Sequence, residues 1–251
     1  MGMHMWRVGV LCASVILTNH AKDIDRIGSN PPEVLTYVKQ FLPDNPVILE
    51  AGACSGEDSV RMKQMWSGAT VHAFEPDPTI FGALTKTVQG IEGIHIYHYA
   101  LGKEMGTVLF NSCICTKPGV SSGCGSLYTP TDEFKAQISI DNYFTKVVEV
   151  PLITIDEWAK RNGVTAIDFM WLDMQGGELA ALKEGKTILP TVKVIYTEVM
   201  FKEAYEKQPL YANMVKFLKE QGFRIAARDF VEKDTEVGRE GNVVFVKDIN
   251  V

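Results

Sequence analysis

The chain has 251 residues, of which 46 % are hydrophobic and 22 % are charged, and its formal net charge is −6. This composition is ordinary for a globular protein that buries a substantial core. The length allows one large domain or two small ones. Lysine and arginine form no long basic run, which argues against a nucleic-acid-binding protein.

The N-terminus carries an apolar run at residues 8–17, directly after Arg7. The run is too short to span a bilayer, which takes about 20 residues. It resembles the core of a secretory signal, but no clean small-residue cleavage site follows it. We therefore expect residues 1–46 to form an N-terminal arm or helical cap on one domain at 47–251, in a cytoplasmic protein. A signal or membrane-associated segment is the alternative.

Strands and helices alternate from residue 47 onward. Short apolar or β-branched runs between turn signals indicate strands, and amphipathic runs with capping residues indicate helices. The predicted strands are 47–51, 70–74, 94–98, 107–110, 147–151, 167–173, 192–198, 223–227 and 242–247. The predicted helices are 57–66, 78–88, 154–161, 177–185 and 210–221, and Thr154 is the expected N-cap of the third of them.

Residues 111–133 interrupt this alternation, because they are rich in Ser, Gly, Cys, Thr and Pro. A segment of this length without regular structure is usually functional or disordered. Three of the five cysteines lie here: Cys113, Cys115 and Cys124. The odd number of cysteines and their irregular spacing argue against a disulfide framework. A C-x-C pair without a nearby fourth ligand is a poor zinc site, so we expect free thiols in a reducing compartment.

The alternation predicts the fold class. Strand–helix–strand repeats form parallel sheets with right-handed crossovers, covered by helices on both faces. The last two strands have no helix between them and are predicted to form an antiparallel hairpin. We therefore expect an α/β protein with a doubly wound, mostly parallel, seven-stranded Rossmann-like sheet. This arrangement matches class I methyltransferases better than dinucleotide-linked dehydrogenases.

The first strand ends in the sequence VILEAGACSGEDS, residues 47–59. Gly52 and Gly56 let the backbone turn sharply and approach a ligand, although a turn from strand to helix favours glycine in any case. A dinucleotide fingerprint would read G-x-G-x-x-G, whereas this loop reads E-x-G-x-x-x-G. The Glu50 carboxylate would repel a pyrophosphate but suits an ammonium group. Glu75 ends the next strand and is placed to accept hydrogen bonds from ribose hydroxyls.

From about residue 47 to residue 246, the chain resembles the FkbM-like S-adenosylmethionine-dependent methyltransferases. The resemblance is carried by the segments VILEAGACSGEDS, HAFEPDP, YHYALG, GSL, ITIDEW and DFMWLDMQGGELAALKEG. Such enzymes typically methylate hydroxyl groups of sugars, glycans or secondary metabolites. The resemblance therefore implies S-adenosyl-L-methionine as cofactor and a small-molecule or glycan hydroxyl as acceptor.

The resemblance also implies roles for individual residues. Glu50, Gly52 and Gly56 would face the methionine moiety, Glu75 the ribose and Ala100 the adenine. The predicted cofactor-binding set is completed by Ala53, Pro76, Ser126 and Asp173, with Ser126 in a loop that caps the site. Cys54 departs from the small or polar residue that many family members have at its position.

Three carboxylates are candidate catalytic residues: Asp173, Glu178 and Glu198. Asp173 and Glu198 end successive predicted strands, and Glu178 lies in the first turn of the helix predicted between them. A hydroxyl that accepts a methyl group must lose its proton, and a carboxylate within hydrogen-bond reach can take it. Asp173 is the first candidate for this base, and His98 is a weaker one. Oxygen ligands also suit a divalent cation such as Mg²⁺, which we consider without favouring it.

The predicted function is O-methylation of a hydroxyl group. Two alternatives stay open: an NAD(P)-dependent oxidoreductase, and a non-catalytic module of the same fold that binds the cofactor or a partner protein. The identity of the acceptor and the oligomeric state are not readable from the sequence.

Overall fold

The computed structural model describes residues 24–115, 123–137 and 142–248. The apolar run at 8–17 lies outside these ranges, as does any signal or membrane contact predicted for it. Among the described helices, none combines the length and apolar character that a membrane crossing needs.

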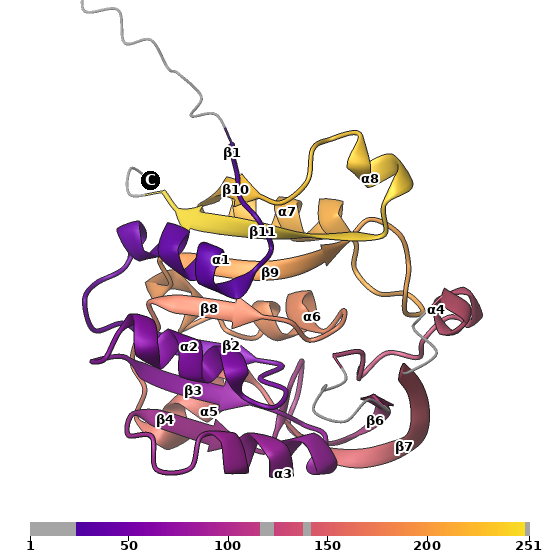
Figure 1. The fold of residues 1–251 in the computed structure, drawn as a ribbon, viewed down its shortest axis with the longest axis horizontal. Helices are drawn as coiled ribbons and strands as arrows, with labels where there is room; N and C mark the ends of the chain where they lie inside the picture. Colours follow the sequence, from indigo (N-terminus) through magenta and orange to yellow (C-terminus); the bar gives the residue numbers. More distant parts are fainter. Residues whose placement is uncertain (1–23, 116–122, 138–141, 249–251) are drawn as a thin grey trace, which may run out of the picture.

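A central sheet of eight strands runs through the molecule in the order β1-β10-β11-β9-β8-β2-β3-β4 (Figure 1). Its bounds are β1 Asp25–Arg26, β2 Val47–Ala51, β3 Thr70–Phe74, β4 Ile94–Tyr97, β8 Phe169–Leu172, β9 Val194–Met200, β10 Phe223–Arg228 and β11 Glu240–Lys247. All neighbours are parallel except β11, which is antiparallel to both β9 and β10. The predicted seven strands and C-terminal hairpin are confirmed, and the short β1 adds an eighth strand.

Helices cover both faces of this sheet (Figure 1). On one side lie α1 Pro31–Val38, α2 Glu57–Met65 and α3 Pro78–Thr87, and on the other α5 Ile155–Asn162, α6 Glu178–Lys183 and α7 Tyr211–Glu220. Side chains alternate along a strand, so Ile48 packs in the core beneath α1 and α2, and Leu49 packs in the core beneath α5, α6 and α7. Burial on both faces explains why the strands read as continuous apolar runs.

Two helix starts follow from capping residues. The Thr154 hydroxyl accepts a hydrogen bond from the backbone N–H of Glu157 at 3.2 Å, which confirms the predicted N-cap of α5. Asn30 caps α1 in the same way, and Val34, Leu35 and Val38 of α1 are buried in the core. The end of the N-terminal arm therefore packs on the sheet domain.

A second sheet stands beside the carboxyl ends of the parallel strands (Figure 1). It has the order β5-β7-β6, with β5 Ala100–Leu101, β6 Gly106–Cys115 and β7 Asn142–Ile153. The strands predicted at 107–110 and 147–151 lie within β6 and β7 and were predicted too short. A further helix, α4 Asp132–Gln137, also falls partly within the segment predicted to be irregular.

The free-thiol interpretation is wrong for Cys113 and Cys124, which form a disulfide with a Cα–Cα distance of 5.6 Å. Asn111 and Ser126 form an antiparallel bridge with two backbone hydrogen bonds. Moving two residues inward from each partner of this bridge brings Cys113 opposite Cys124. Directly opposed residues in such a hydrogen-bonded register lie about 5.5 Å apart, which suits a disulfide. The same bond removes two of the three sulfurs considered for zinc.

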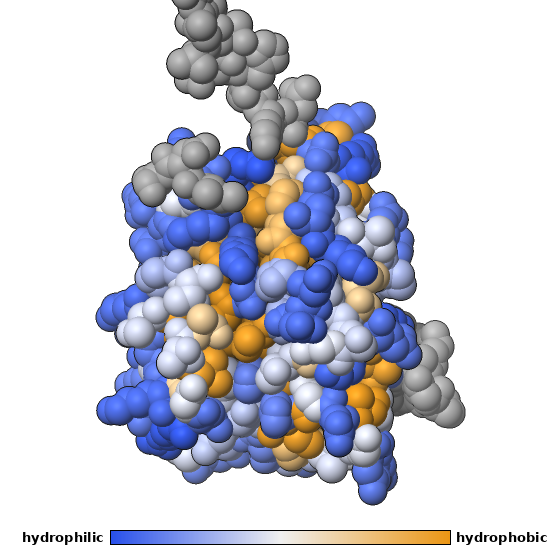
Figure 2. Space-filling view, turned by 90° about the vertical axis from the view of Figure 1, so that its left-hand side faces the viewer, coloured by the Kyte–Doolittle hydropathy of each residue, from blue (hydrophilic) through white to orange (hydrophobic). Residues whose placement is uncertain are grey.

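Two short 3₁₀ helices, Lys39–Phe41 and Leu189–Thr191, and the helix α8 Asp234–Val237 complete the described elements. Figure 2 looks onto the edge of the molecule at the amino ends of the parallel strands, where apolar side chains surface between charged ones. The opposite edge, at the carboxyl ends, carries the features described next.

Candidate active site

A cleft that is partly open to solvent lies at the carboxyl ends of β2, β3 and β8. The chain order of the sheet reverses between β2 and β8, which is where open α/β sheets bind ligands. Of the predicted site residues, five line this cleft: Gly52, Glu75, Pro76, Ala100 and Asp173. The second sheet closes the cleft with Phe110 and Cys113, and the segment after the disulfide adds Leu127.

Gly52 has to be glycine because the backbone of Asp173, directly after the neighbouring strand β8, lies against it. Its φ is 84°, and a Cβ placed there would lie 1.8 Å from the carbonyl oxygen of Asp173. Gly56 also has a positive φ, of 90°, but a Cβ there would meet Leu84 of α3 at 2.7 Å. Gly56 thus permits the packing of α2 against α3, and it is not among the residues that line the cleft.

Glu75 lines the cleft, and its carboxylate accepts hydrogen bonds from the loops that follow β2 and β3. One oxygen accepts a hydrogen bond from the backbone N–H of Cys54 at 3.0 Å, and the other from that of Asp77 at 2.8 Å. Burial raises the pKa of Glu75 to about 8, although the hydrogen bond from Asp77 opposes this. Each carboxylate oxygen keeps a further lone pair, so Glu75 can still accept hydrogen bonds from a diol.

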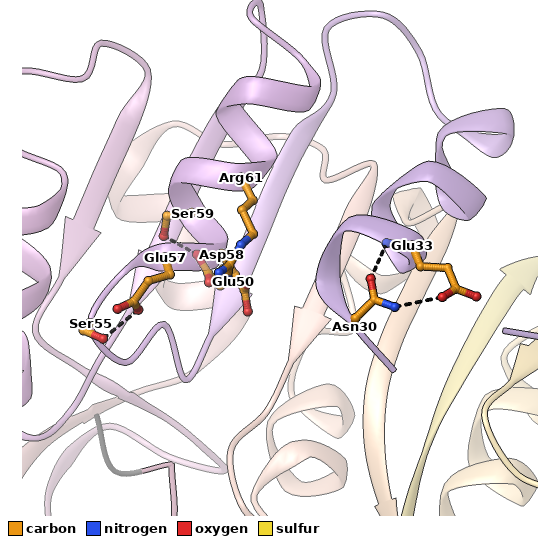
Figure 3. A network of polar contacts seen from close by, with 8 residues as sticks. All are labelled: Asn30, Glu33, Glu50, Ser55, Glu57, Asp58, Ser59 and Arg61. Carbon is orange, nitrogen blue, oxygen red and sulfur yellow. Dashed lines mark hydrogen bonds and ion pairs between the residues drawn. The ribbon is translucent and has the colours of Figure 1, made fainter. Parts of the chain in front are cut away.

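Glu50 turns away from the cleft and toward α2 (Figure 3). It is 2 % exposed, and one of its carboxylate oxygens accepts a hydrogen bond from the Ser59 hydroxyl. Burial raises the pKa of Glu50 to about 8, and the negative charges of Asp58, Glu57 and Glu75 add to this rise. The predicted contact of Glu50 with the cofactor's ammonium group stays a prediction.

Asp173 faces the cleft and is joined to Glu198 by a residue that the sequence did not single out. The side-chain amide of Gln175 donates one hydrogen bond to Asp173 at 2.7 Å and another to Glu198 at 2.8 Å. The pKa of Asp173 is raised, chiefly by burial. The pKa of Glu198 is raised by burial and by the charge of Asp173. Glu198 itself does not line the cleft.

Glu178 and Ser126 also lie outside the cleft wall. Glu178 accepts hydrogen bonds from the backbone N–H groups of Met174 at 2.7 Å and Gly176 at 3.4 Å, so it fixes the loop after β8. Burial raises the pKa of Glu178 to about 7. The Ser126 hydroxyl donates to the backbone carbonyl of Gln175 at 2.7 Å and ties the capping segment to the same loop. Glu178 and Glu198 line a separate small pocket.

The remaining candidates have structural partners. Ala53 is buried, and its backbone N–H donates to the carbonyl of Phe74. His98 donates from Nε2 to the carbonyl of Pro76 at 3.0 Å and stacks on Phe81. Cys54 is half-buried and lines the cleft. Within the described ranges, no group of three or more His, Cys, Asp or Glu side chains is arranged to hold a metal ion.

The residues of the cleft fit an S-adenosylmethionine molecule. Two carboxylates, Glu75 and Asp173, line the space together with apolar side chains, and small-molecule sites commonly combine a few polar groups with a mainly apolar wall. Sequence reasoning missed Asp77, which also lines the cleft: it caps α3 and accepts a hydrogen bond from the hydroxyl of Ser112 of β6. The sequence Asp77-Pro78 was a usable signal for this cap.

Several known proteins are similar to this chain. The 2-O-methyltransferase NoeI of Sinorhizobium fredii (strain NBRC 101917 / NGR234) is 29 % identical over 178 residues, covering 68 % of this chain and 70 % of that protein. The methyltransferase sdnD of Sordaria araneosa is 25 % identical, covering 57 % of this chain and 61 % of that protein. A solved S-adenosylmethionine-dependent methyltransferase from Aquifex aeolicus aligns over 85 % of this chain and 88 % of its own, with 13 % identity and a TM-score of 0.43.

The model of the methyltransferase FkbM domain matches residues 50–225, which contain the whole cleft wall described above. This match decides against the oxidoreductase alternative and for an enzyme that uses S-adenosylmethionine. The chain belongs to the FkbM methyltransferase family.

Proposed function

We propose that this enzyme transfers the methyl group of S-adenosylmethionine to a hydroxyl oxygen of a sugar, glycan or secondary metabolite. The observation that carries the proposal is the placement of two carboxylates, Glu75 and Asp173, on the wall of one cleft at the switch point of the sheet. The 2-O-methyltransferase name of the relative from Sinorhizobium supports a hydroxyl acceptor.

Different residues along the cleft are expected to contact different parts of the cofactor. S-adenosylmethionine supplies an activated methyl group on a sulfonium. Glu75 is positioned to accept hydrogen bonds from the ribose hydroxyls, and Ala100 forms part of the apolar wall expected near the adenine. Gly52 lines the cleft where the methionine end is expected. Phe110 and Leu127 help to exclude water from the cleft.

Asp173 is the proposed base. Methyl transfer is an in-line displacement, which requires the acceptor oxygen to be held about 3–3.5 Å from the methyl carbon. The hydroxyl proton passes to the Asp173 carboxylate as the new oxygen–carbon bond forms. Its raised pKa makes Asp173 a stronger base than an ordinary aspartate, which favours this proton transfer.

The test combines binding and turnover. Calorimetry should show binding of S-adenosylmethionine and S-adenosylhomocysteine, and mass spectrometry should show a gain of one methyl group on a member of a panel of sugars, oligosaccharides and polyketide alcohols. With that acceptor, Asp173→Asn should lose about 10²-fold or more of the rate while still binding S-adenosylhomocysteine. Glu198→Gln, whose side chain is off the cleft wall, should lose less. Binding without transfer to any acceptor would favour the non-catalytic alternative.

The cytoplasmic location stays a prediction. Reducing compartments keep protein thiols reduced, so an intact Cys113–Cys124 bond in protein alkylated at the moment of cell lysis would contradict it.

A further inference from the structure

We propose that Gln175 is a positioning residue of the methyl-transfer site, because its side-chain amide holds the Asp173 carboxylate toward the cleft and apart from Glu198. This inference rests on the proposed role of Asp173 as the base. Gln175 follows β8 by three residues and is 8 % exposed, so its contacts are made inside the protein.

The amide can take only one orientation. Its two N–H bonds are directed at two carboxylates, Asp173 at 2.7 Å and Glu198 at 2.8 Å. Its oxygen lies 3.0 Å from the hydroxyl of Tyr205, whose proton it shares with the backbone carbonyl of Cys124 at 2.8 Å. The reversed orientation would place the amide oxygen against both carboxylates and the nitrogen against the tyrosine oxygen, so two donors would be lost.

The backbone of Gln175 is fixed as well. Its φ is 52°, a left-handed conformation that is uncommon for a residue with a side chain. The Ser126 hydroxyl donates to its carbonyl at 2.7 Å, and Gly176 continues the turn with a φ of 100°. A residue held in a disfavoured conformation by contacts from other segments is a feature that collects at functional sites.

The charge around Asp173 explains why such a residue is needed. The acidic groups whose charges act on the Asp173 and Glu198 pair, or are acted on by it, come from several elements: Asp58, Glu75, Glu178 and Glu240. When two neighbouring carboxylates have no hydrogen-bond donor between them, their mutual repulsion raises the pKa of one, which then stays protonated and uncharged. The amide of Gln175 supplies a hydrogen bond to each, and so keeps Asp173 able to accept a proton near neutral pH.

The experiment titrates Asp173 directly. The enzyme is labelled with ¹³C at aspartate carboxyl carbons, the Asp173 signal is identified by its loss in Asp173→Asn, and its midpoint is followed with pH. In Gln175→Met, which has a similar shape but no donor, the midpoint should rise by about one pH unit or more, a tenfold gain in proton affinity. Gln137→Met is the matched control, because Gln137 is exposed on α4 and donates to a single glutamate there.

Calorimetry with S-adenosylmethionine provides a second readout. Gln175→Met should weaken binding about tenfold at pH 6, where its Asp173 is protonated, and less than about threefold at pH 8.5, where the carboxylate is charged again. Should this variant fold poorly, Gln175→Asn carries the same test, since asparagine tolerates a positive φ but is too short to reach both carboxylates.

The inference is overturned by an unchanged Asp173 midpoint in the folded variant, or by a loss of binding that is equal at both pH values. Failure of the wild-type enzyme to bind S-adenosylmethionine would instead overturn the proposed function. The titration of Asp173 would still report on Gln175 in that case.

Discussion

Replacing Glu50 by glutamine should stabilise the ligand-free protein at neutral and alkaline pH. Glu50 is 2 % exposed, and its carboxylate is met by one hydroxyl, that of Ser59. Glutamine has the same size, and its amide oxygen can still accept the hydrogen bond from Ser59. The substitution therefore removes the cost of ionising a buried acid while keeping the size of the side chain.

The size of the effect follows from the pKa. Burial raises the pKa of Glu50 from 4.5 to about 8. A raised pKa means that the stability contributed by the neutral acid is complete below pH 4.5 and is lost as pH rises through 8. At 1.36 kcal/mol for each unit, the loss is about 3 kcal/mol at pH 7 and approaches about 5 kcal/mol above pH 8, as an upper bound.

Urea unfolding of the wild type and of Glu50→Gln between pH 4.5 and 8.5 measures this difference. The two proteins should agree within about 1 kcal/mol at pH 4.5 and diverge by several kcal/mol at pH 8.5. Glu220→Gln, at an exposed position on α7, is the control and should show no such divergence. A Glu50→Gln protein that is less stable than the wild type at every pH would refute the reasoning, because it would show that the carboxylate is ionised and compensated in the fold.

Three further predictions concern stability. Gly52→Ala should lower the free energy of unfolding in urea by about 2–5 kcal/mol, since its Cβ would meet a backbone oxygen at the end of β8 and its φ is 84°. The control Gly163→Ala has a φ of 66° and nothing within 4 Å of the added atom, so it should lower this free energy by only about 1–2 kcal/mol. Reduction of Cys113–Cys124 should lower the stability measured by calorimetry by about 3 kcal/mol, as expected for a short loop. The stability of a variant with serine at both positions should not change when reductant is added. Burial lowers the pKa of His72 to about 4, so its contribution is complete above pH 6.5 and falls by about 2 kcal/mol at pH 5; His72→Gln should remove that dependence, and an unchanged pH profile would contradict it.

The sequence was sufficient for the central sheet because local signals and tertiary structure agree there. The strands at Val47–Ala51 and Thr70–Phe74 have the predicted bounds, since each is a short apolar run that a polar turn ends at the edge of the sheet. The C-terminal hairpin was predicted from the lack of an intervening helix pattern, and β10 and β11 do pair antiparallel.

The second sheet was harder to predict because its strands contain polar residues that the fold buries. Asn111 donates to the carbonyl of Tyr128, and Ser112 is 1 % exposed and donates to Asp77. In the sequence, such residues beside glycine and cysteine read as a loop. The disulfide was missed for the same reason, since the register that opposes Cys113 and Cys124 depends on the second half of β6, which was not predicted.

The candidate site was predicted in part. Gly52, Glu75 and Asp173 line the cleft because all three lie at strand ends, a position that sequence patterns report well. Gln175 was not singled out, because its importance depends on Glu198 and Tyr205, which lie 23 and 30 residues away along the chain. A left-handed backbone at glutamine also has no sequence signal, whereas one at glycine does.

The carboxylates at this edge of the sheet have a common consequence for ligand binding. In the described ranges, the hydrogen bonds to Glu75 and Asp173 come from backbone N–H groups and from Gln175, and the pKa of both acids is raised. A sulfonium cation placed between them would favour their charged forms, so its binding should release protons. The affinity for S-adenosylmethionine should then rise between pH 6 and 8.5, by up to about tenfold per pH unit for each proton released.

S-adenosylhomocysteine tests the role of the sulfonium charge, because it has the same ribose and amino-acid groups as S-adenosylmethionine but no positive sulfur. Its affinity, measured by calorimetry over the same pH range, should rise less steeply than that of S-adenosylmethionine. Equal slopes for the two ligands would contradict a role for the sulfonium. They would assign the proton release to the ammonium end that both ligands share, and Glu50 would then become the first carboxylate to test, through the binding of both ligands to Glu50→Gln.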